Sequence, residues 1–591
     1  MVRMLTAAAV GALLAGGASA STAPTPCQQL NGTTLPLDGV ASQVSLSAVD
    51  VPGFTQDGIT LPNFCYVSLV VSSNANPAQS QIQIAIGMPE GGAWNGRFVG
   101  TGNGGFAGSI SVDSIALYVA QGYATANTDL GTGILFACNS RYCGSAEGAL
   151  AANGSAKLGG LYGDPAALRD FGFGAIHLMT LAGKQLVLAY YGQAPSYNYF
   201  HGCSTGGQNA LMEAQRYPTD YNGIVAGSPA YDRTHLHVAG AAFFEGTHLA
   251  GSTTGSITQA AFSLAHAGVL AACAGKDGGL ASDDFLMKPA SCQFDATALQ
   301  CTGAVGEVPC TDPNATSCTC LTAIQSLGFN KLWVGAQDSL GRILYPGYER
   351  GAEDPGTAPA GGPPDQEHVT EPLFDSLDYW AFGKYFTWNS LFANTDGLQG
   401  LLAGRIAALD KAPAGGADFA TVLNADNANI TPFAAAGGKL VIYAGYEDPL
   451  IPAASALDYA NAVAKDDAVN YGNYLRLFLA PGMWHCSGGP GANAFGNLGT
   501  PLAPVLGDPA DDIFAAMRNW VENGVAPSTI LATKYTDDTV ANGVAFTRPL
   551  CAYPANAKYR GAGDPTNAAS WECAAGDAVR NQAFAPLYGP H

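Results

Sequence analysis

The chain has 591 residues, of which 48% are hydrophobic and only 12% are charged, so it can bury a large core and exceeds one average domain. This composition excludes a disordered chain. The formal net charge is -21, with 46 acidic against 25 basic residues, which would repel both a phosphate backbone and an anionic membrane surface. We therefore predict no nucleic-acid partner and no membrane partner, and the sequence carries no indication of oligomeric state.

The first twenty residues have the pattern of a secretory signal. Arg3 gives a basic start, an Ala/Leu/Val run follows, and Ala18, Ser19 and Ala20 supply the small residues of a cleavage site. The apolar run is too short to cross a bilayer, and no later stretch is long enough. We expect residues 1–20 to be a signal peptide and the mature protein to be secreted, either to the periplasm or outside the cell.

If the protein is exported, its fourteen cysteines are expected to form disulfides, because an oxidising compartment favours disulfides over metal-binding thiols. No cysteine pair has the spacing of a zinc ribbon. Short spacing predicts the pairs Cys138–Cys143, Cys273–Cys292 and Cys551–Cys573, with further bridges among Cys301, Cys310, Cys318 and Cys320.

Extended and helical segments alternate along the chain, which predicts an α/β fold with a mostly parallel sheet. Strands are expected at 81–88, 97–102 and 197–203, and a helix is expected from Asp164 to about Tyr191. Residues 231–395 are rich in Gly, Pro and Cys and interrupt this alternation of strands and helices, which resumes at about residue 437. We therefore predict one domain made of residues 21–230 and 396–591, with residues 231–395 as an insertion.

The stretch "YFHGCSTGGQ" contains a Gly-x-Ser-x-Gly pattern, formed by Gly202, Ser204 and Gly206. In such a nucleophile elbow a strand turns sharply into a helix and presents the serine hydroxyl at the tip. The predicted order of strand, serine and helix is the context that the motif requires, so Ser204 is a candidate nucleophile.

A nucleophilic serine needs a base and an acid, which in this type of fold follow the serine in the order acid, then histidine. "KLVIYAGYEDPLIP" predicts a buried strand that runs into a loop with Glu447 and Asp448. "LRLFLAPGMWHCSGG" predicts another strand, which runs into His485. His485 is therefore the candidate base, with either Glu447 or Asp448 as the acid.

Other histidines fit this role less well. His201 is close to Ser204 in sequence, but a residue within the elbow strand can seldom turn to meet its own neighbour. His235 and His237 alternate as strand residues do and offer two metal ligands, yet no third ligand of matching spacing accompanies them.

The cysteine before Ser204 also finds a candidate partner. Cys203 precedes the candidate nucleophile and Cys486 follows the candidate base. If Ser204 and His485 come within hydrogen-bond reach, the two sulfur atoms lie close enough to form a disulfide that limits their separation. The alternative is that Cys203 is a small buried residue at the end of a strand.

Two backbone N–H groups are expected to stabilise the oxyanion that forms when such a serine attacks a carbonyl group. One belongs to Thr205, the residue after the nucleophile. The other is expected in the Gly-rich loop "GNGGF", where Gly104 and Gly105 are candidates. The alternative is that this loop is an ordinary glycine turn.

These motifs together resemble the tannase and feruloyl esterase family. The resemblance covers nearly the whole mature chain and is strongest in "HGCSTGGQNALMEAQRYPTDYNGIVAGSPA", "GYEDPLIP" and "PGMWHCSGGPG". It implies an α/β-hydrolase fold with a large inserted lid, at residues 231–395, and an enzyme that hydrolyses esters of aromatic acids. By this resemblance Ser204 is the nucleophile, His485 the base and Asp448 the acid, with a Cys203–Cys486 disulfide beside them.

The implied substrate is a small aromatic ester, such as a hydroxycinnamoyl or galloyl ester. The sequence of the predicted lid departs from the family pattern, so the resemblance does not imply which acyl group this chain accepts. Four aromatic residues are candidates for an acyl pocket, although such a stripe is more often helix core: Trp380, Phe382, Phe386 and Trp388. The alternatives are a hydrolase of the same fold that cleaves terephthalate monoesters or peptides, and a secreted binding protein with an inert fold.

We predict that no cofactor is required. Relatives of the family carry a calcium loop in the lid, and the corresponding "CAGKDGGLASDDF" places Ala274 and Ala281 where that pattern has aspartates. Asp277 and Asp283 are the remaining candidate ligands. Since calcium takes six to eight oxygen ligands, the loss of two carboxylates argues against a calcium site here.

Overall fold

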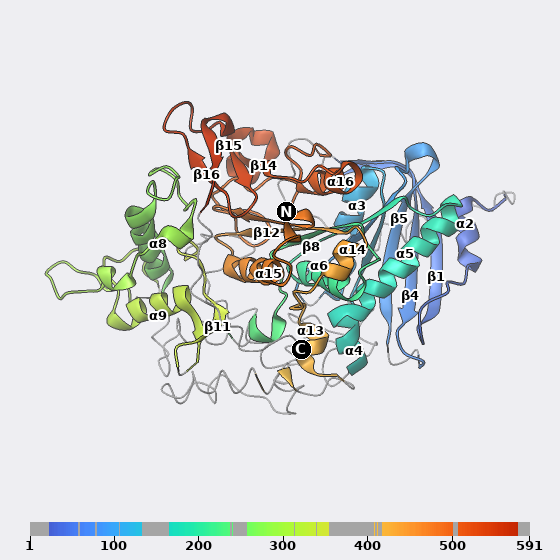
Figure 1. Cartoon of the computed structure of the whole chain (residues 1–591), viewed down its shortest axis with the longest axis horizontal. Coiled ribbons are helices and arrows are strands. Elements are labelled where there is room, and N and C mark those ends of the chain that lie inside the picture. The colour runs from blue at the N-terminus through green and yellow to red at the C-terminus, as the bar shows by residue number, and fades with distance from the viewer. Residues whose placement is uncertain are drawn as a thin grey trace.

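The structure is a computed structural model, and it describes residues 23–56, 59–76, 80–105, 107–132, 165–236, 239, 257–312, 314–338, 340–353, 407, 410–411, 417–499 and 506–576. Within these residues a nine-stranded sheet forms the centre of the molecule, in the order β1-β4-β5-β7-β6-β8-β9-β12-β13 (Figure 1). Its strands are β1 (Ser42–Val51), β4 (Phe64–Ser72), β5 (Ile82–Pro89), β6 (Arg97–Thr101), β7 (Ala124–Thr128), β8 (Tyr197–Cys203), β9 (Gly223–Gly227), β12 (Lys439–Gly445) and β13 (Leu475–Ala480).

The sheet has two parts that differ in strand direction. From β7 to β13 every neighbouring pair is parallel, as predicted. The pairs β1–β4, β4–β5 and β5–β7 are antiparallel, and the sequence analysis did not identify β1 or β4. Because parallel strands end at the same edge, the residues that follow β6, β8, β12 and β13 lie at one edge of the sheet.

Helices cover both faces of the parallel part. Side chains of successive strand residues point to opposite faces, so Phe98 and Phe200 join one apolar core while Val99 and Tyr199 join the other. The first core includes residues of α5 (Ala175–Tyr191), α6 (Thr205–Arg216) and α15 (Ala453–Asp466). The second includes residues of α3 (Val112–Ala120) and α16 (Ile513–Asn523). The result is an α/β sandwich of three layers (Figure 1).

The helix expected from Asp164 to Tyr191 is interrupted near its start. α4 (Pro165–Arg169) leads into a π-helical turn at Asp170–Gly174, and α5 follows. The buried Asp170 carboxylate accepts hydrogen bonds from Ser73 (2.5 Å) and Ser80 (2.7 Å), and Gly172 packs against the Val422 backbone with no room for a Cβ. These contacts reach across the chain, so the local sequence did not indicate the π turn.

The prediction that no stretch after the signal is long enough to cross a bilayer is wrong by length and composition, since among the described residues the helical stretch Asp170–Tyr191 is long and apolar enough. Of its most apolar window, 61% is buried inside the protein. Burial to this extent is typical of a core helix that packs against a sheet.

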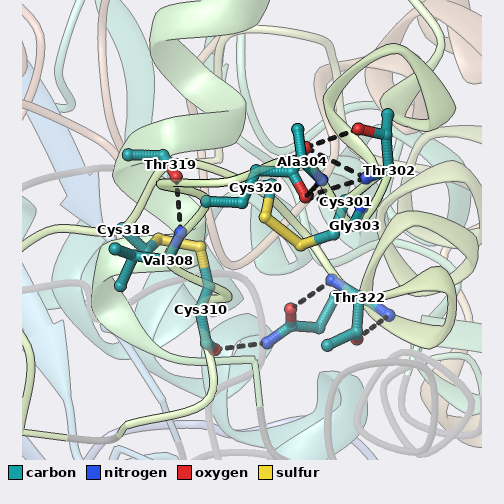
Figure 2. Close-up of a disulfide and its surroundings, with 12 residues drawn as sticks. Cys301, Thr302, Gly303, Ala304, Val308, Cys310, Cys318, Thr319, Cys320 and Thr322 are labelled. Carbon is teal, nitrogen blue, oxygen red and sulfur yellow. Dashed lines mark hydrogen bonds between the residues drawn. A yellow bond between two sulfur atoms is a disulfide. The ribbon is translucent and has the colours of Figure 1, made fainter.

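Residues 257–353 of the insertion, as far as the structure describes them, form a lobe beside the sheet, at the left of Figure 1. It contains α8 (Gln259–Cys273), α9 (Ala323–Val334) and the short hairpin of β10 (Gly335–Gln337) and β11 (Ile343–Pro346). Two nested disulfides, Cys301–Cys320 and, within it, Cys310–Cys318, hold a loop of few regular elements (Figure 2). Gln325 joins this loop to the start of α9, because its side chain donates to the Cys310 carbonyl (2.7 Å) and accepts the amide of Thr322, the N-cap residue (2.9 Å).

Six disulfides occur among the described residues. Cys273–Cys292 and Cys551–Cys573 pair as predicted, and the four neighbouring cysteines of the insertion pair as 301–320 and 310–318. Cys27–Cys65 was not predicted, and it joins α2 (Pro26–Gln29) to β4. The predicted pair Cys138–Cys143 lies outside the described residues. So many disulfides are typical of a protein that folds in an oxidising compartment outside the cytosol.

The last part of the chain adds two hairpins outside the main sheet. β14 (Thr529–Tyr535) pairs with β15 (Val544–Cys551), and β16 (Asn556–Tyr559) pairs with β17 (Trp571–Ala574). Both lie near the lobe of the insertion, at the top of Figure 1. Phe285 and Met287 of the insertion share a small apolar core with Cys551 and Trp571, which fastens the lobe to these hairpins.

A partly buried ion pair joins the sheet to α16. The Arg97 guanidinium donates two bonds to the Glu522 carboxylate, each 2.6 Å, and the Tyr199 hydroxyl donates a third (2.7 Å). Burial would raise the pKa of Glu522, but the bonds from Arg97 and Tyr199 outweigh burial and hold this pKa below its usual 4.5. A carboxyl group whose pKa is lower in the folded chain than in the unfolded chain stabilises the fold at pH values above the unfolded-state pKa. This stabilisation is lost as the pH falls through the folded-state pKa.

We expect Glu522→Gln to lower the free energy of unfolding by about 2 kcal/mol at neutral pH, because charge-assisted bonds are lost. As pH falls from about 4 through the lowered pKa of folded Glu522, the difference from the wild type should shrink, because the carboxyl is protonated first in the unfolded chain and then in the folded one. Urea unfolding of the variant and the wild type at several pH values measures this difference in the free energy of unfolding. Glu572→Gln is the matched control, since the Arg560–Glu572 pair is 51% and 43% exposed and should contribute little. Equal losses for the two variants would contradict the prediction.

Candidate active site

Ser204 lies at the turn between β8 and α6, at the edge where the parallel strands end. Its backbone has φ 64° and ψ -121°, a conformation that residues with side chains seldom adopt and that is typical of a nucleophile elbow. Its N–H donates to the Gly227 carbonyl (2.9 Å), so the strained turn is held by the neighbouring strand β9.

The glycines of the motif permit this turn because backbones pass very close together. A Cβ on Gly202 would lie 2.3 Å from the Gly206 carbonyl oxygen, and a Cβ on Gly102 would lie 2.4 Å from the Gly206 Cα. No side chain fits between these segments. The glycines therefore bring the end of β6, the end of β8 and the start of α6 into contact.

His485 follows β13 and Asp448 follows β12, so both lie at the same edge as Ser204. The Nδ1 atom of His485 is 2.8 Å from Oδ2 of Asp448. The other carboxylate oxygen, Oδ1, accepts the amides of Leu450 and Ile451, each at 2.9 Å. Asp448 is 1% exposed, and its two amide bonds fix the carboxylate whose other oxygen meets the imidazole.

The disulfide between Cys203 and Cys486 is present, with 6.0 Å between its Cα atoms. It joins the residue before Ser204 to the residue after His485 across 283 positions of sequence. Cys486 itself has a positive φ of 64°, and Asn497 donates to its carbonyl (2.8 Å). The histidine loop is thus bound covalently to the elbow.

Glu447, the alternative acid, has a different environment. It is 3% exposed, and its carboxyl faces the insertion, where His266, Glu353 and Asp284 act on it. Burial raises its pKa well above the usual 4.5, although His266 opposes this rise. The imidazole of His485 is therefore paired with Asp448, and Glu447 belongs to the contact between the sheet and the inserted lobe.

The other candidate histidines lie apart from this pair. His201 is fully buried, its Nδ1 is 2.5 Å from the Tyr118 hydroxyl, and burial lowers its pKa to about 3. His235 lies between Asp232 (2.8 Å) and Asp410 (3.1 Å). His237 lies outside the described residues, as do the four aromatic candidates for an acyl pocket.

The Thr205 amide and the loop after β6 face the same region. Thr205 is the first residue of α6, so its N–H has no partner within the helix. Within the described residues, the amides of Gly104 and Gly105 donate no hydrogen bond, and both glycines are exposed. The Thr205 hydroxyl donates to the Gly105 carbonyl (2.5 Å), which ties the loop to the helix.

The carboxylates of the two candidate calcium ligands are bonded to N–H groups of the protein. Asp277 accepts the amides of Gly279 (3.1 Å) and Met287 (2.6 Å), one on each oxygen. Asp283 accepts the Leu280 amide (2.9 Å) on one oxygen and pairs with the Arg548 guanidinium on the other (3.4 Å). All four oxygens face N–H donors, and one donor is a cation, so this donor set does not fit a calcium ion.

Two other groups of side chains have the spacing of metal ligands. The cysteines of the first, Cys301 and Cys320, form a disulfide. In the second, Asp220 accepts from His177 (2.8 Å) and from the Lys184 ammonium (3.1 Å), so a cation already neutralises it. Burial raises the pKa of the third member, Glu213, well above 4.5, which favours an uncharged carboxyl. Neither group therefore has the free anionic donors of a metal site.

Two polar side chains that were not predicted from the sequence hold this edge together. Asn127 donates to the Thr101 carbonyl (3.1 Å) and to Asn103 (2.9 Å), and Arg233 donates to Thr205 and Gln208. Arg233 stands in "YDRTHLH", where the alternation of His235 and His237 is typical of a strand, whereas residues 233–236 are helical. No local signal distinguishes such a buried arginine from an exposed one.

A strained serine at an elbow, a partly buried histidine–carboxylate pair and a loop whose amides donate no bond within the described residues lie where parallel strands end. This fold and site together define the class of the protein as an α/β hydrolase with an insertion.

Comparisons with known proteins narrow this class. The sequence model described as "Tannase and feruloyl esterase" matches residues 65–574. An uncharacterized esterase of Xanthomonas campestris pv. campestris is 33% identical, over 97% of this chain and 94% of its own length. A probable feruloyl esterase B of Emericella nidulans is 29% identical, with 90% of each chain covered. The crystal structure of feruloyl esterase B from Aspergillus oryzae has a TM-score of 0.73 at 26% identity, covering 93% of this chain and 99% of that one. The chain belongs to the tannase and feruloyl esterase family and is an esterase of that family.

Proposed function

We propose that the protein is a secreted serine esterase that cleaves esters of aromatic acids, such as hydroxycinnamic or gallic acid, through an acyl-enzyme. Ser204 is the nucleophile, His485 the general base and Asp448 the acid that orients it. The proposal is carried by one observation, the His485–Asp448 hydrogen bond in a loop that the Cys203–Cys486 disulfide joins to the residue before Ser204.

The proposed reaction follows from these roles. With Nδ1 bonded to Asp448, Nε2 of His485 is left to accept the Ser204 proton as Oγ attacks the ester carbonyl. The C–O bond to the alcohol then breaks, and His485 returns the proton to the departing alkoxide. Water repeats both steps on the acyl-enzyme and releases the acid and the free serine.

The negative charge of each tetrahedral intermediate is stabilised by backbone N–H groups. Thr205 contributes one, supported by its place at the start of α6, where the helix dipole also favours negative charge. Gly104 or Gly105 contributes the other, supported by their amides, which donate no bond within the described residues.

The aromatic acyl group is the finer part of the proposal. It is supported by the family description and by relatives named as feruloyl esterases. The proposed substrate is a small ester. Export of the protein is supported by its disulfides and by the signal-like residues 1–20.

The test is hydrolysis of methyl ferulate, methyl gallate, chlorogenate and p-nitrophenyl butyrate by the purified protein and its Ser204→Ala variant. We expect turnover of at least one aromatic ester, abolished in the variant. Ser326→Ala is a control for the loss of a serine hydroxyl elsewhere, since Ser326 is buried in α9, where it donates to the Thr322 carbonyl. Turnover of butyrate alone would overturn the aromatic specificity, and turnover that survives in Ser204→Ala would overturn the site.

We also propose that no metal is required. Because the four oxygens of Asp277 and Asp283 face protein donors, we expect EDTA, followed by gel filtration into metal-free buffer, to leave kcat and Tm unchanged. Activity and thermal unfolding measured with and without added calcium check this. A rise of several degrees in Tm on adding calcium would contradict it, because it would reveal a bound ion.

A further inference from the structure

Arg233 is a buried cation immediately behind the start of α6. Its side chain belongs to a residue that is 3% exposed, and its guanidinium donates two bonds to α6. Nη2 donates to the Thr205 hydroxyl (2.7 Å), and Nε donates to the Gln208 side chain (2.9 Å). Gln208 in turn donates to the Leu423 carbonyl (2.5 Å), which fixes it from the other side. The guanidinium is therefore held in one place by the first turn of the helix.

The chemistry of Arg233 determines the direction of the next bond. A guanidinium can only donate, so the Thr205 oxygen accepts from Arg233 and its own proton is directed elsewhere. That proton goes to the Gly105 carbonyl, 2.5 Å away. A chain of donors thus runs from Arg233 through Thr205 to the loop after β6. Burial lowers the pKa of Arg233 to about 9, which still leaves it protonated at neutral pH.

We propose that Arg233 is a positioning residue, which acts through the Thr205 hydroxyl to fix the distance between Thr205 and the Gly104–Gly105 loop. This inference rests on the proposed function, in which those two segments supply the amides of the oxyanion hole. The loop is already attached at its other end, where the Gly102 amide donates to the His201 carbonyl (3.1 Å). The Thr205 bond is a further attachment, at the end of the loop that carries the candidate amides.

The consequence concerns the transition state rather than substrate binding. Amides stabilise an oxyanion only when they lie at the right distance from it, and a displacement of about 1 Å can lower a rate about 100-fold. Loss of the attachment should therefore reduce kcat and leave KM nearly unchanged.

The experiment compares Thr205→Val, which keeps the shape but removes the hydroxyl, with Thr205→Ser, which keeps the hydroxyl. Both are assayed on the best ester of the panel and with an aryl trifluoromethyl ketone, whose adduct with serine carries an oxyanion. For Thr205→Val we expect kcat to fall about 10- to 100-fold, KM to change less than about twofold, and ketone inhibition to weaken by the same factor as kcat. Thr205→Ser should recover most of the loss.

Arg233→Met tests the origin of the effect. It should lower kcat to a similar degree, and the double variant with Thr205→Val should lose no more than either single variant, since both interrupt one chain of bonds. If Arg233→Met does not fold, the two Thr205 variants decide the question alone. Thr180→Val is the control for buried threonines, because Thr180 bonds Ile176 and Tyr221 and should lose stability without losing kcat.

The outcomes separate this inference from the proposed function. A Thr205→Val variant that loses only stability, as Thr180→Val does, or one that changes KM alone, overturns the positioning role. Activity in Ser204→Ala overturns the proposed site instead. If the wild type hydrolyses none of the esters, the rate at which a fluorophosphonate labels Ser204 replaces kcat, because that reaction also develops negative charge on oxygen.

Discussion

Asp448→Asn is expected to lower kcat about 10⁴-fold on any ester that the protein hydrolyses, while the fold stays intact. The carboxylate now accepts from Nδ1 of His485 at 2.8 Å and so leaves Nε2 unprotonated toward Ser204. An asparagine can present its NH₂ group to Nδ1, which stabilises the other tautomer and places the ring proton on Nε2. The histidine could then not accept the serine proton. Ester assays and circular dichroism on the same preparation measure both effects.

The neighbouring Glu447→Gln provides the matched control, because it is the same chemical change one residue away. Glu447 faces His266 and Glu353 rather than His485, and burial already raises its pKa. We expect this variant to keep kcat within about threefold, which is under 1 kcal/mol in the barrier. A large loss of kcat in Glu447→Gln with little loss in Asp448→Asn would reverse the assignment of the acid.

The parts of the site that could be predicted from sequence are those in which local pattern and topology act together. Gly202 and Gly206 are required by close backbone contacts around Ser204, so the elbow has a signature in consecutive residues. Asp448 and His485 each follow a buried parallel strand, and such strands end at one edge of a sheet. The pairing of Cys203 with Cys486 follows, because each is adjacent to a residue of that edge.

What could not be predicted depends on contacts between distant segments with weak local patterns. β1 has a half-exposed, serine-rich sequence with little alternation, and its place in the sheet is set by pairing with β4. Cys27 and Cys65 are 38 positions apart and meet through that region. Arg233 is charged, a type of residue that is seldom buried, and only the surrounding Thr205 and Gln208 show why it is. The family resemblance favoured Asp448 over Glu447 as the acid, but the physical reason depends on the insertion, whose His266 and Glu353 face Glu447.

Replacing Cys203 and Cys486 together by alanine should reduce both stability and kcat, and the two effects have separate causes. Without the bond, the unfolded chain regains the freedom of a loop that spans 283 positions, which lowers the free energy of unfolding by about 5 kcal/mol in the entropic treatment. In the folded protein, the histidine loop is free to move away from the elbow. We expect kcat to fall at least about 10-fold at temperatures well below Tm, because alignment of Ser204 and His485 is then only partly maintained. Mild reduction of the wild type, followed by mass spectrometry to prove loss of this disulfide, should act in the same direction before the protein unfolds.

Removal of the Cys310–Cys318 disulfide by a double alanine variant separates the two causes. That bond spans only 8 positions within the insertion, so its loss should lower the free energy of unfolding by about 3 kcal/mol. It lies outside the edge where the parallel strands end, and kcat should stay as in the wild type. If both double variants lose stability but neither loses kcat, the Cys203–Cys486 disulfide serves stability alone, and Ser204 and His485 are aligned by the packing of β8, β12 and β13. If only the Cys203/Cys486 variant loses kcat, the disulfide itself maintains the geometry on which proton transfer depends, which explains why a cysteine stands directly before the serine.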